Sequence, residues 1–276
     1  MVYGIIKLLN FAHGDIYMTG AFACFFGFGL LSDHVPGIPS WIGIICAILA
    51  GMALVGFLGW TTQRLAYRPM LGAPRLSLLI TAIGVSLVIY NGVMFFTNSR
   101  PFFFTSPWDD SAGFSFANIT VTNIQIILIA VSALCMLGLT VFVGRTMMGK
   151  AMRAISLDQD ACRLMGINVH KVIGITFMIG SALAALAGGM ACIYYGSVQF
   201  TMGFIIGIKA FTSAVIGGIG SIPGAMLGGL LLGLLEAYGT QFLGSEWKDA
   251  FAFGILILIL VFRPNGLMGK TTVERM

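Results

Sequence analysis

The amino-acid sequence predicts an all-α polytopic membrane protein with about eight apolar spans. Hydrophobic residues make up 58% of the 276-residue chain, and its mean hydropathy is +0.97. A soluble fold must still show polar groups to water, so this composition excludes a soluble domain. The chain also has 37 glycines, a residue that is more frequent in membrane helices than in soluble ones.

The expected spans are the long apolar stretches between polar segments. They cover residues 14–31, 40–60, 76–96, 123–144, 172–195, 204–219, 224–242 and 250–263. A helix rises about 1.5 Å per residue, so about 20 residues cross the hydrocarbon core. The last stretch is therefore short for a full crossing. Residues 1–11 are typical of the end of another helix.

The Lys and Arg residues indicate how the chain is oriented. Counting spans up and down places the 61–75 loop, the 145–171 loop and the C-terminal tail on one side, with 11 of the 15 cations. Cytoplasmic loops are enriched in Lys and Arg, so we expect this side to be cytoplasmic and the 97–122 loop to be external. This distribution accounts for the net charge of +5 without nucleic-acid binding.

Small residues recur at every fourth position in the segment GSIPGAMLGG. Gly220, Gly224 and Gly228 have this spacing, which lets helix backbones approach closely in lipid. The pattern predicts helix packing, and the alternative is that small side chains keep a pathway open. Pro223, within the same run, marks a turn or a helix break.

Three polar residues, Asn10, His13 and Asp15, lie at the edge of the first apolar span. Polar side chains cost several kcal/mol in hydrocarbon, so we expect them to face protein or water. One interpretation is a broken helix capped by Asn10 or Asp15, with His13 bonded to a backbone carbonyl. The other is that the three residues border the substrate path.

Lys209 and Glu236 flank the turn near Ser221, at separations of 12 and 15 residues. These separations correspond to about 18 and 22 Å along two antiparallel helices, so both side chains are expected at similar depth. An ion pair would offset the cost of burying the two charges. The alternative is that each side chain reaches the membrane surface separately.

Residues 144–151, GRTMMGKA, come within one residue of the nucleotide-binding loop G-x-x-x-x-G-K-[ST]. Ala151 stands where that loop needs a hydroxyl to bind Mg²⁺, and an apolar span precedes Gly144 where the loop needs a strand. Direct nucleotide binding is therefore not expected. The five cysteines form no C-x-x-C pair, so no metal site is expected, and no catalytic acid–base pair or nucleophile is apparent.

The polar segment also predicts a short amphipathic helix over residues 158–166. Asp158 is a good N-cap, Asp160 lies in the first turn and Arg163 in the last, and Gly166 follows as a stop. The apolar residues expected on one face, at 3-4-3 spacing, are Ala154, Leu157, Ala161 and Leu164. By physical chemistry alone, such a helix could lie on lipid headgroups or dock into a groove of a partner.

Several motifs resemble those of LivH-type permeases of branched-chain amino acid ABC importers. Residues 160–166, DACRLMG, are similar to the E-A-A-x-x-x-G cytoplasmic loop of ABC importer permeases, with Asp160 and Cys162 in place of Glu and the second Ala. The further similar stretches are VYGIIKLLNFAHGD at 2–15, RPMLGAPRLSLLITAIGVSL at 68–87, IKAFTSAVIGGIGSIPGAMLGGLLLGLLEAYG at 208–239 and FRPNGLMG at 262–269. The resemblance covers nearly the whole chain.

The resemblance implies that residues 1–276 form a single permease domain of the bacterial cytoplasmic (inner) membrane, which carries leucine, isoleucine or valine inward by alternating access. It also implies a non-catalytic subunit whose ATP is hydrolysed by two partner ATPase subunits, beside a second related permease and a periplasmic or extracellular binding protein. Coupling to the ATPase would use Arg153, Asp158, Asp160, Ala161, Cys162, Arg163 and Gly166. The family normally has one more apolar span before MVYGII, so this chain is expected to lack the family's first span.

Two other functions are alternatives to a permease for branched-chain amino acids. Related permeases serve importers of urea and amides, and an apolar pathway does not identify its substrate. A secondary transporter working without an ATPase would need discontinuous helices with charged ion sites at the membrane midplane, usually in repeated halves. The sequence shows no clear internal repeat, and such a transporter would leave the helix at 158–166 without a role.

Overall fold

The computed structural model describes residues 10–34, 39–104, 113–116, 119–218, 220–263 and 266–269. Its α-helices are α2 (Ala12–His34), α3 (Ser40–Thr62), α4 (Arg75–Phe96), α5 (Asn123–Arg145), α6 (Met147–Leu157), α7 (Gln159–Leu164), α8 (Val169–Tyr195), α9 (Met202–Gly217), α10 (Ile222–Leu243) and α11 (Lys248–Phe262). The prediction of an all-α membrane fold is confirmed. Residues 1–9 lie outside the described part of the chain, so the expectation about a missing first span stays an expectation.

Each of the eight expected spans is a helix, but two of them are short. Among the described residues, six helices are long and apolar enough to cross a membrane. Helices α9 and α11 have 16 and 15 residues, so they extend about 24 and 23 Å, which is less than a hydrocarbon core of about 30 Å. The prediction of about eight apolar helices is confirmed, and six of them have the length of a full crossing.

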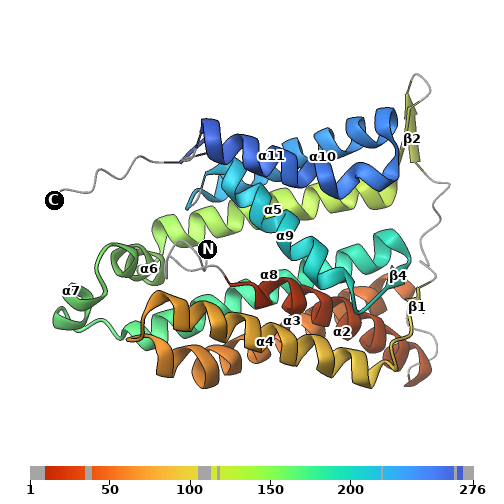
Figure 1. Ribbon diagram of the computed structural model, residues 1–276. Helices are drawn as coiled ribbons and strands as arrows, with labels where there is room; N and C mark the ends of the chain where they lie inside the picture. The colour runs from red at the N-terminus through yellow and green to blue at the C-terminus, as the bar shows by residue number, and fades with distance from the viewer. Residues whose placement is uncertain are drawn as a thin grey trace.

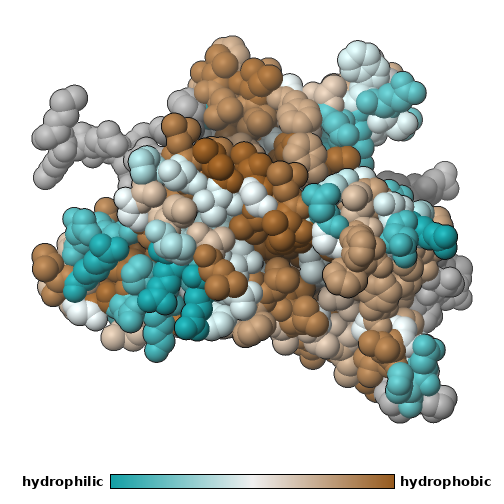
Figure 2. Space-filling model, turned by 60° about the horizontal axis from the view of Figure 1, so that its bottom comes forward, coloured by the Kyte–Doolittle hydropathy of each residue, from teal (hydrophilic) through white to brown (hydrophobic). Residues whose placement is uncertain are grey.

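The long helices lie side by side, and the polar segments gather at the two ends of the bundle (Figure 1). Helices α6 and α7 lie at one end, together with the connection from α3 to α4 and the end of α11. We call this the basic end, because its exposed cations are Arg64, Arg68, Arg145, Lys150, Arg153, Arg163, Lys171 and Arg263. Figure 2 shows an apolar surface between hydrophilic patches at the two ends, as expected for a protein that spans a membrane.

Short strands lie at the end opposite the basic end (Figure 1). Strand β1 (Phe102–Phe103) pairs with β4 (Ser197–Val198), and β2 (Gly113–Phe116) pairs with β3 (Ile119–Thr122), both antiparallel. For the segment that contains β1, β2 and β3, the sequence predicted only an external loop over residues 97–122. Phe102 packs against Phe25 of α2 with ring centroids 5.3 Å apart, so strand β1 is held against the bundle.

Helix α2 lies at the centre of the bundle and packs against α3, α4, α8 and α9. Its side chains Ala12, Ile16 and Met18 are completely buried. Small residues allow these close contacts, because a Cβ at Gly14 would overlap the carbonyl oxygen of Gly203 in α9. The first half of α2, up to Cys24, is buried on nearly every side, so it has no apolar stripe opposite a polar one that would have revealed its central place.

The glycine run beside Pro223 packs α9 against α10, although not at every position expected. A Cβ at Gly224 would overlap the carbonyl oxygen of Gly217, and a Cβ at Gly228 would overlap that of Ser213. Gly220, by contrast, has φ 94° and no atom within 4 Å of its added Cβ, so it serves the turn and not the packing. Including Gly220 in the packing set was therefore wrong. Helix α10 begins at Ile222, just before Pro223, as the predicted break requires.

Candidate functional site

Helices α6 and α7 form a hairpin that stands at the basic end of the bundle (Figure 1). Asp158 ends α6 and caps α7, because its Oδ1 accepts hydrogen bonds from the backbone N–H groups of Asp160 at 2.8 Å and Ala161 at 3.0 Å. Gly166 ends the hairpin with φ 81°, a conformation that favours glycine. The expected N-cap and stop residue are both present, and the helix between them covers Gln159–Leu164.

The single apolar face expected from Ala154 to Leu164 is not formed. Asp158 has φ −150° and ψ 115°, so it separates α6 from α7 and a helical period cannot run through it. The buried residue of α7 is Cys162, 6% exposed, whereas Ala161 is exposed to solvent. The expectation that Ala161 lies on a face shared with Ala154 is therefore corrected, because the chain turns between them.

The outer end of the hairpin carries three apolar side chains that contact little else in the described structure. Leu157, Leu164 and Met165 are 82%, 90% and 83% exposed, and we call them the tip surface. On the same hairpin, Arg163 forms an ion pair with Asp160 at 3.0 Å, and a guanidinium nitrogen of Arg153 donates to the carbonyl oxygen of Gly144 at the end of α5 at 3.2 Å. Exposed apolar side chains among charged ones, lying outside the membrane-spanning helices, are typical of a protein-binding surface.

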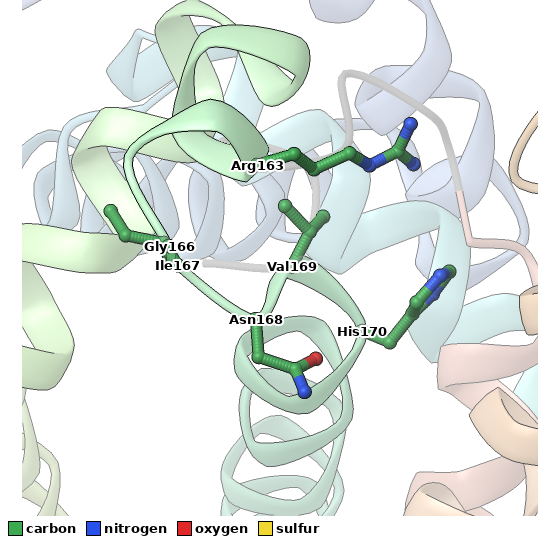
Figure 3. Close-up of a pocket in the computed structure, with 6 residues that line it drawn as sticks. All are labelled: Arg163, Gly166, Ile167, Asn168, Val169 and His170. Carbon is green, nitrogen blue, oxygen red and sulfur yellow. The ribbon is translucent and has the colours of Figure 1, made fainter.

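A hollow of about 330 Å³ lies where α7 joins α8 (Figure 3). Its lining residues are Arg163, Gly166, Ile167, Asn168, Val169 and His170. Figure 3 shows the side chains of Arg163 and His170 extending to the same side of this loop, with Val169 between them. The hollow therefore places hydrogen-bond donors directly beside the tip surface.

The hairpin is fixed to the bundle by a group of buried apolar residues, which we call the basic-end core. Its members come from α4, α6, α7, α8 and the π-helix η1 (Gln63–Tyr67) that extends α3, and they are Tyr67, Leu78, Ala82, Met152, Ile155, Cys162, Val169, Val172, Ile173 and Phe177. Because α6 and α7 both contribute to this core, the hairpin is packed against residues of α4, α8 and the π-helix that extends α3.

The near-match to a nucleotide-binding loop does not have the shape of one. Residues 144–151 form the end of α5 and the first turns of α6, so Gly149 and Lys150 are helical. Thr146 accepts a hydrogen bond from the backbone N–H of Gly149 at 3.0 Å and caps α6. A phosphate-binding loop needs successive backbone N–H groups turned toward the ligand, and here the N–H groups of Gly149 and Lys150 bond to the side chain and the carbonyl oxygen of Thr146.

The polar residues near the start of α2 bond to neighbouring helices. The hydroxyl of Tyr67 donates to Asn10 Oδ1 at 2.8 Å, and the hydroxyl of Ser86, near the middle of α4, donates to Asp15 Oδ2. The capping interpretation of Asn10 and Asp15 is therefore wrong, because both side chains are directed to other helices. His13 is half-buried in the first turn of α2. Sequence reasoning missed Tyr67 and Ser86, although Ser86 is a polar residue within an apolar span.

Lys209 and Glu236 lie together, and two further charges join them. Lys209 Nζ is 3.0 Å from Glu236 Oε1 and 2.9 Å from Asp249 Oδ1, and Lys248 Nζ is 3.9 Å from Glu236 Oε2. The contact to Glu236 Oε1 is an electrostatic one, since no well-directed hydrogen bond from the described residues reaches this oxygen. Asp249 was missed because it belongs to α11, whose position beside α9 is a matter of tertiary packing.

Comparison with known proteins identifies the family. Residues 1–260 match the family described as branched-chain amino acid transport system / permease component. The chain is 44% identical over its whole length to the high-affinity branched-chain amino acid transport system permease protein BraD of Pseudomonas aeruginosa, and 41% identical to LivH of Escherichia coli, covering 90% of each.

A second kind of relative carries the name of the same transport system. The chain is 26% identical, over 98% of its length and 66% of the relative's, to the permease protein LivM of Salmonella typhimurium. No solved structure matches the chain. The apolar helices and the whole-length similarity lead to one conclusion: the chain is a multi-pass membrane protein that belongs to the family of permease components of branched-chain amino acid transport systems.

Proposed function

We propose that this chain is the membrane-spanning permease subunit of an ATP-binding-cassette importer that carries leucine, isoleucine and valine inward by alternating access. The observation that carries the proposal is the 44% identity, over the whole chain, to a permease of a high-affinity branched-chain amino acid system. The chain itself is non-catalytic, and residues 1–276 form one transmembrane domain. ATP is hydrolysed on separate subunits of the importer.

The exposed side chains of the α6–α7 hairpin are evidence for a partner subunit that supplies the energy of transport. A lone membrane subunit gains nothing from exposing Leu164 and Met165 to water, since burying such side chains is favourable by about 1.5–3 kcal/mol each. An ATPase subunit whose apolar groove receives the tip surface accounts for this exposure. The coupling residues are then Arg153, Asp158, Asp160, Ala161, Cys162, Arg163 and Gly166, of which Cys162 anchors the helix to the bundle.

The other partners follow from the organisation of such a system. A related permease, of the kind that LivM represents, would complete the membrane part of the importer beside this chain. Two ATPase subunits would bind at the basic end, and a periplasmic or extracellular binding protein would deliver the substrate at the opposite end. Lipid covers the remaining apolar surface, and the assembly belongs to the bacterial inner membrane.

The orientation of the chain is the first prediction. We expect the basic end to be cytoplasmic, because Lys and Arg are retained on that side of the membrane. In a cysteine-free background, Ser245→Cys, at the end opposite the basic end, should react with an impermeant thiol reagent in intact cells. Ser156→Cys in α6 should react only after the membrane is opened. If Ser156→Cys alone reacted in intact cells, the basic end would be external. The hairpin could then not bind a cytoplasmic ATPase.

The second prediction concerns substrate and energy source. Proteoliposomes that contain the complete importer and its binding protein should accumulate leucine only when ATP is present on the side of the ATPase subunits. Isoleucine and valine should compete with leucine for uptake, whereas urea and short amides should not. Competition by urea or amides in place of valine would support the alternative importer, and uptake without ATP would support a secondary transporter.

A further inference from the structure

Helix α3 changes its geometry where it reaches the basic end. Its last α-helical residue is Thr62, and residues Gln63–Tyr67 continue as the π-helix η1. A π-turn accommodates one extra residue, so it turns the following side chains by about 100° relative to a regular α-helix. This turn directs Tyr67 into the bundle, where it is only 4% exposed.

Tyr67 makes two contacts with different parts of the bundle. Its ring lies in the basic-end core, with its centroid 5.0 Å from that of Phe177 in α8. Its hydroxyl leaves this apolar core and donates to Asn10 Oδ1 at 2.8 Å. Tyr67 thus connects the core that holds the α6–α7 hairpin to Asn10, which lies two residues before the start of α2.

The start of α2 is buried and closely packed against its neighbouring helices. Its first residues are buried where α4, α8 and α9 meet it, and Asp15, 4% exposed, is bonded to Ser86 near the middle of α4. Gly14 lies against Gly203 and Gly207 of α9 without room for a Cβ. A small displacement of Asn10 therefore changes packing at the middle depth of the bundle, because interiors of this density do not deform smoothly.

We propose that Tyr67 is a positioning residue, whose hydroxyl bond to Asn10 carries movement of the α6–α7 hairpin to the start of α2 and so into the translocation pathway. This inference rests on the proposed function, because it assumes that an ATPase moves the hairpin. Gln63, in the same π-turn, fits such a role: it is 3% exposed, and among the described residues its Nε2 has no hydrogen-bond partner. Buried side-chain amides are usually hydrogen-bonded, so the amide of Gln63 is free to form a bond in a second arrangement of the π-turn.

The variant Tyr67→Phe tests this role in the complete importer. The phenylalanine ring keeps the packing on Phe177, so assembly and ATP hydrolysis should be retained. Loss of one hydrogen bond should lower the number of leucine molecules carried per ATP hydrolysed by about three- to tenfold. Asn10→Leu should give the same loss, and the double variant should lose no more than either single variant, because both remove one interaction.

Tyr90→Phe is the matched control. The ring of Tyr90 packs on Phe200 at 5.7 Å, and its hydroxyl has no hydrogen bond among the described residues, so the ratio of leucine to ATP should not change. If the wild-type importer carries leucine but Tyr67→Phe keeps the normal ratio, or loses uptake and hydrolysis in equal proportion, the inference is wrong. If the wild-type importer carries no leucine, or assembles with no ATPase, the proposed function itself has failed.

Discussion

Replacing Leu164 by aspartate is expected to release the ATPase subunits from the purified importer and to abolish leucine uptake. Leu164 is 90% exposed in α7, so the substitution should not destabilise the permease itself. Burial of this side chain in a partner contributes about 1.5–3 kcal/mol, and an unpaired carboxylate in the same groove costs more. A total of about 3 kcal/mol weakens binding at least about 100-fold. Co-purification of the ATPase with the tagged permease, followed by uptake assays, measures both effects.

Lys150→Ala in α6 is the control for Leu164→Asp. Lys150 is exposed at the basic end but lies outside the tip surface, so ATPase binding and uptake should be largely retained. If Lys150→Ala instead removed nucleotide binding measured on the isolated permease, residues 144–151 would act as a nucleotide site after all. If Leu164→Asp kept both the bound ATPase and full uptake, the hairpin would be an element that lies on the lipid surface.

Replacing Lys209 by methionine is expected to lower the free energy of unfolding by about 3–5 kcal/mol, the second large effect. Lys209 forms ion pairs with the carboxylates of Glu236 and Asp249, and Glu236 is only 8% exposed. Without the ammonium group of Lys209, the buried carboxylate of Glu236 has one neighbouring cation among the described residues, Lys248 at 3.9 Å. The folded fraction after heating in detergent, followed by gel filtration, measures the loss.

The double variant Lys209→Met, Glu236→Met separates pairing from simple loss of side chains. It removes the buried carboxylate together with its partner, so it should be more stable than Lys209→Met alone. Lys171→Met, at the exposed start of α8, should change stability by less than about 0.5 kcal/mol and serves as the control. Losses for Lys209 and Glu236 that simply add would show that the two charges do not interact.

The candidate site could be predicted from the sequence where local chemistry decides the structure. Asp158 was expected as an N-cap and Gly166 as a stop, since capping and positive φ depend on the residue itself and its nearest neighbours. The apolar face of the hairpin could not be predicted, because one extended residue, Asp158, ends the helical period. The burial of Cys162 depends on the basic-end core, whose members come from five segments of the chain.

The sequence by itself determined the membrane fold, the ends of most helices and the side on which the cations gather. These properties follow from apolar length and charge, which each segment carries regardless of its neighbours. Only the tertiary structure decided that α2 is central, that Asn10 bonds to Tyr67, and that Asp249 joins Lys209. The reason is that lipid and protein interior are equally apolar, so hydropathy cannot tell which face of a span meets another helix. Steric fit and polar pairing make that choice between residues far apart in the chain.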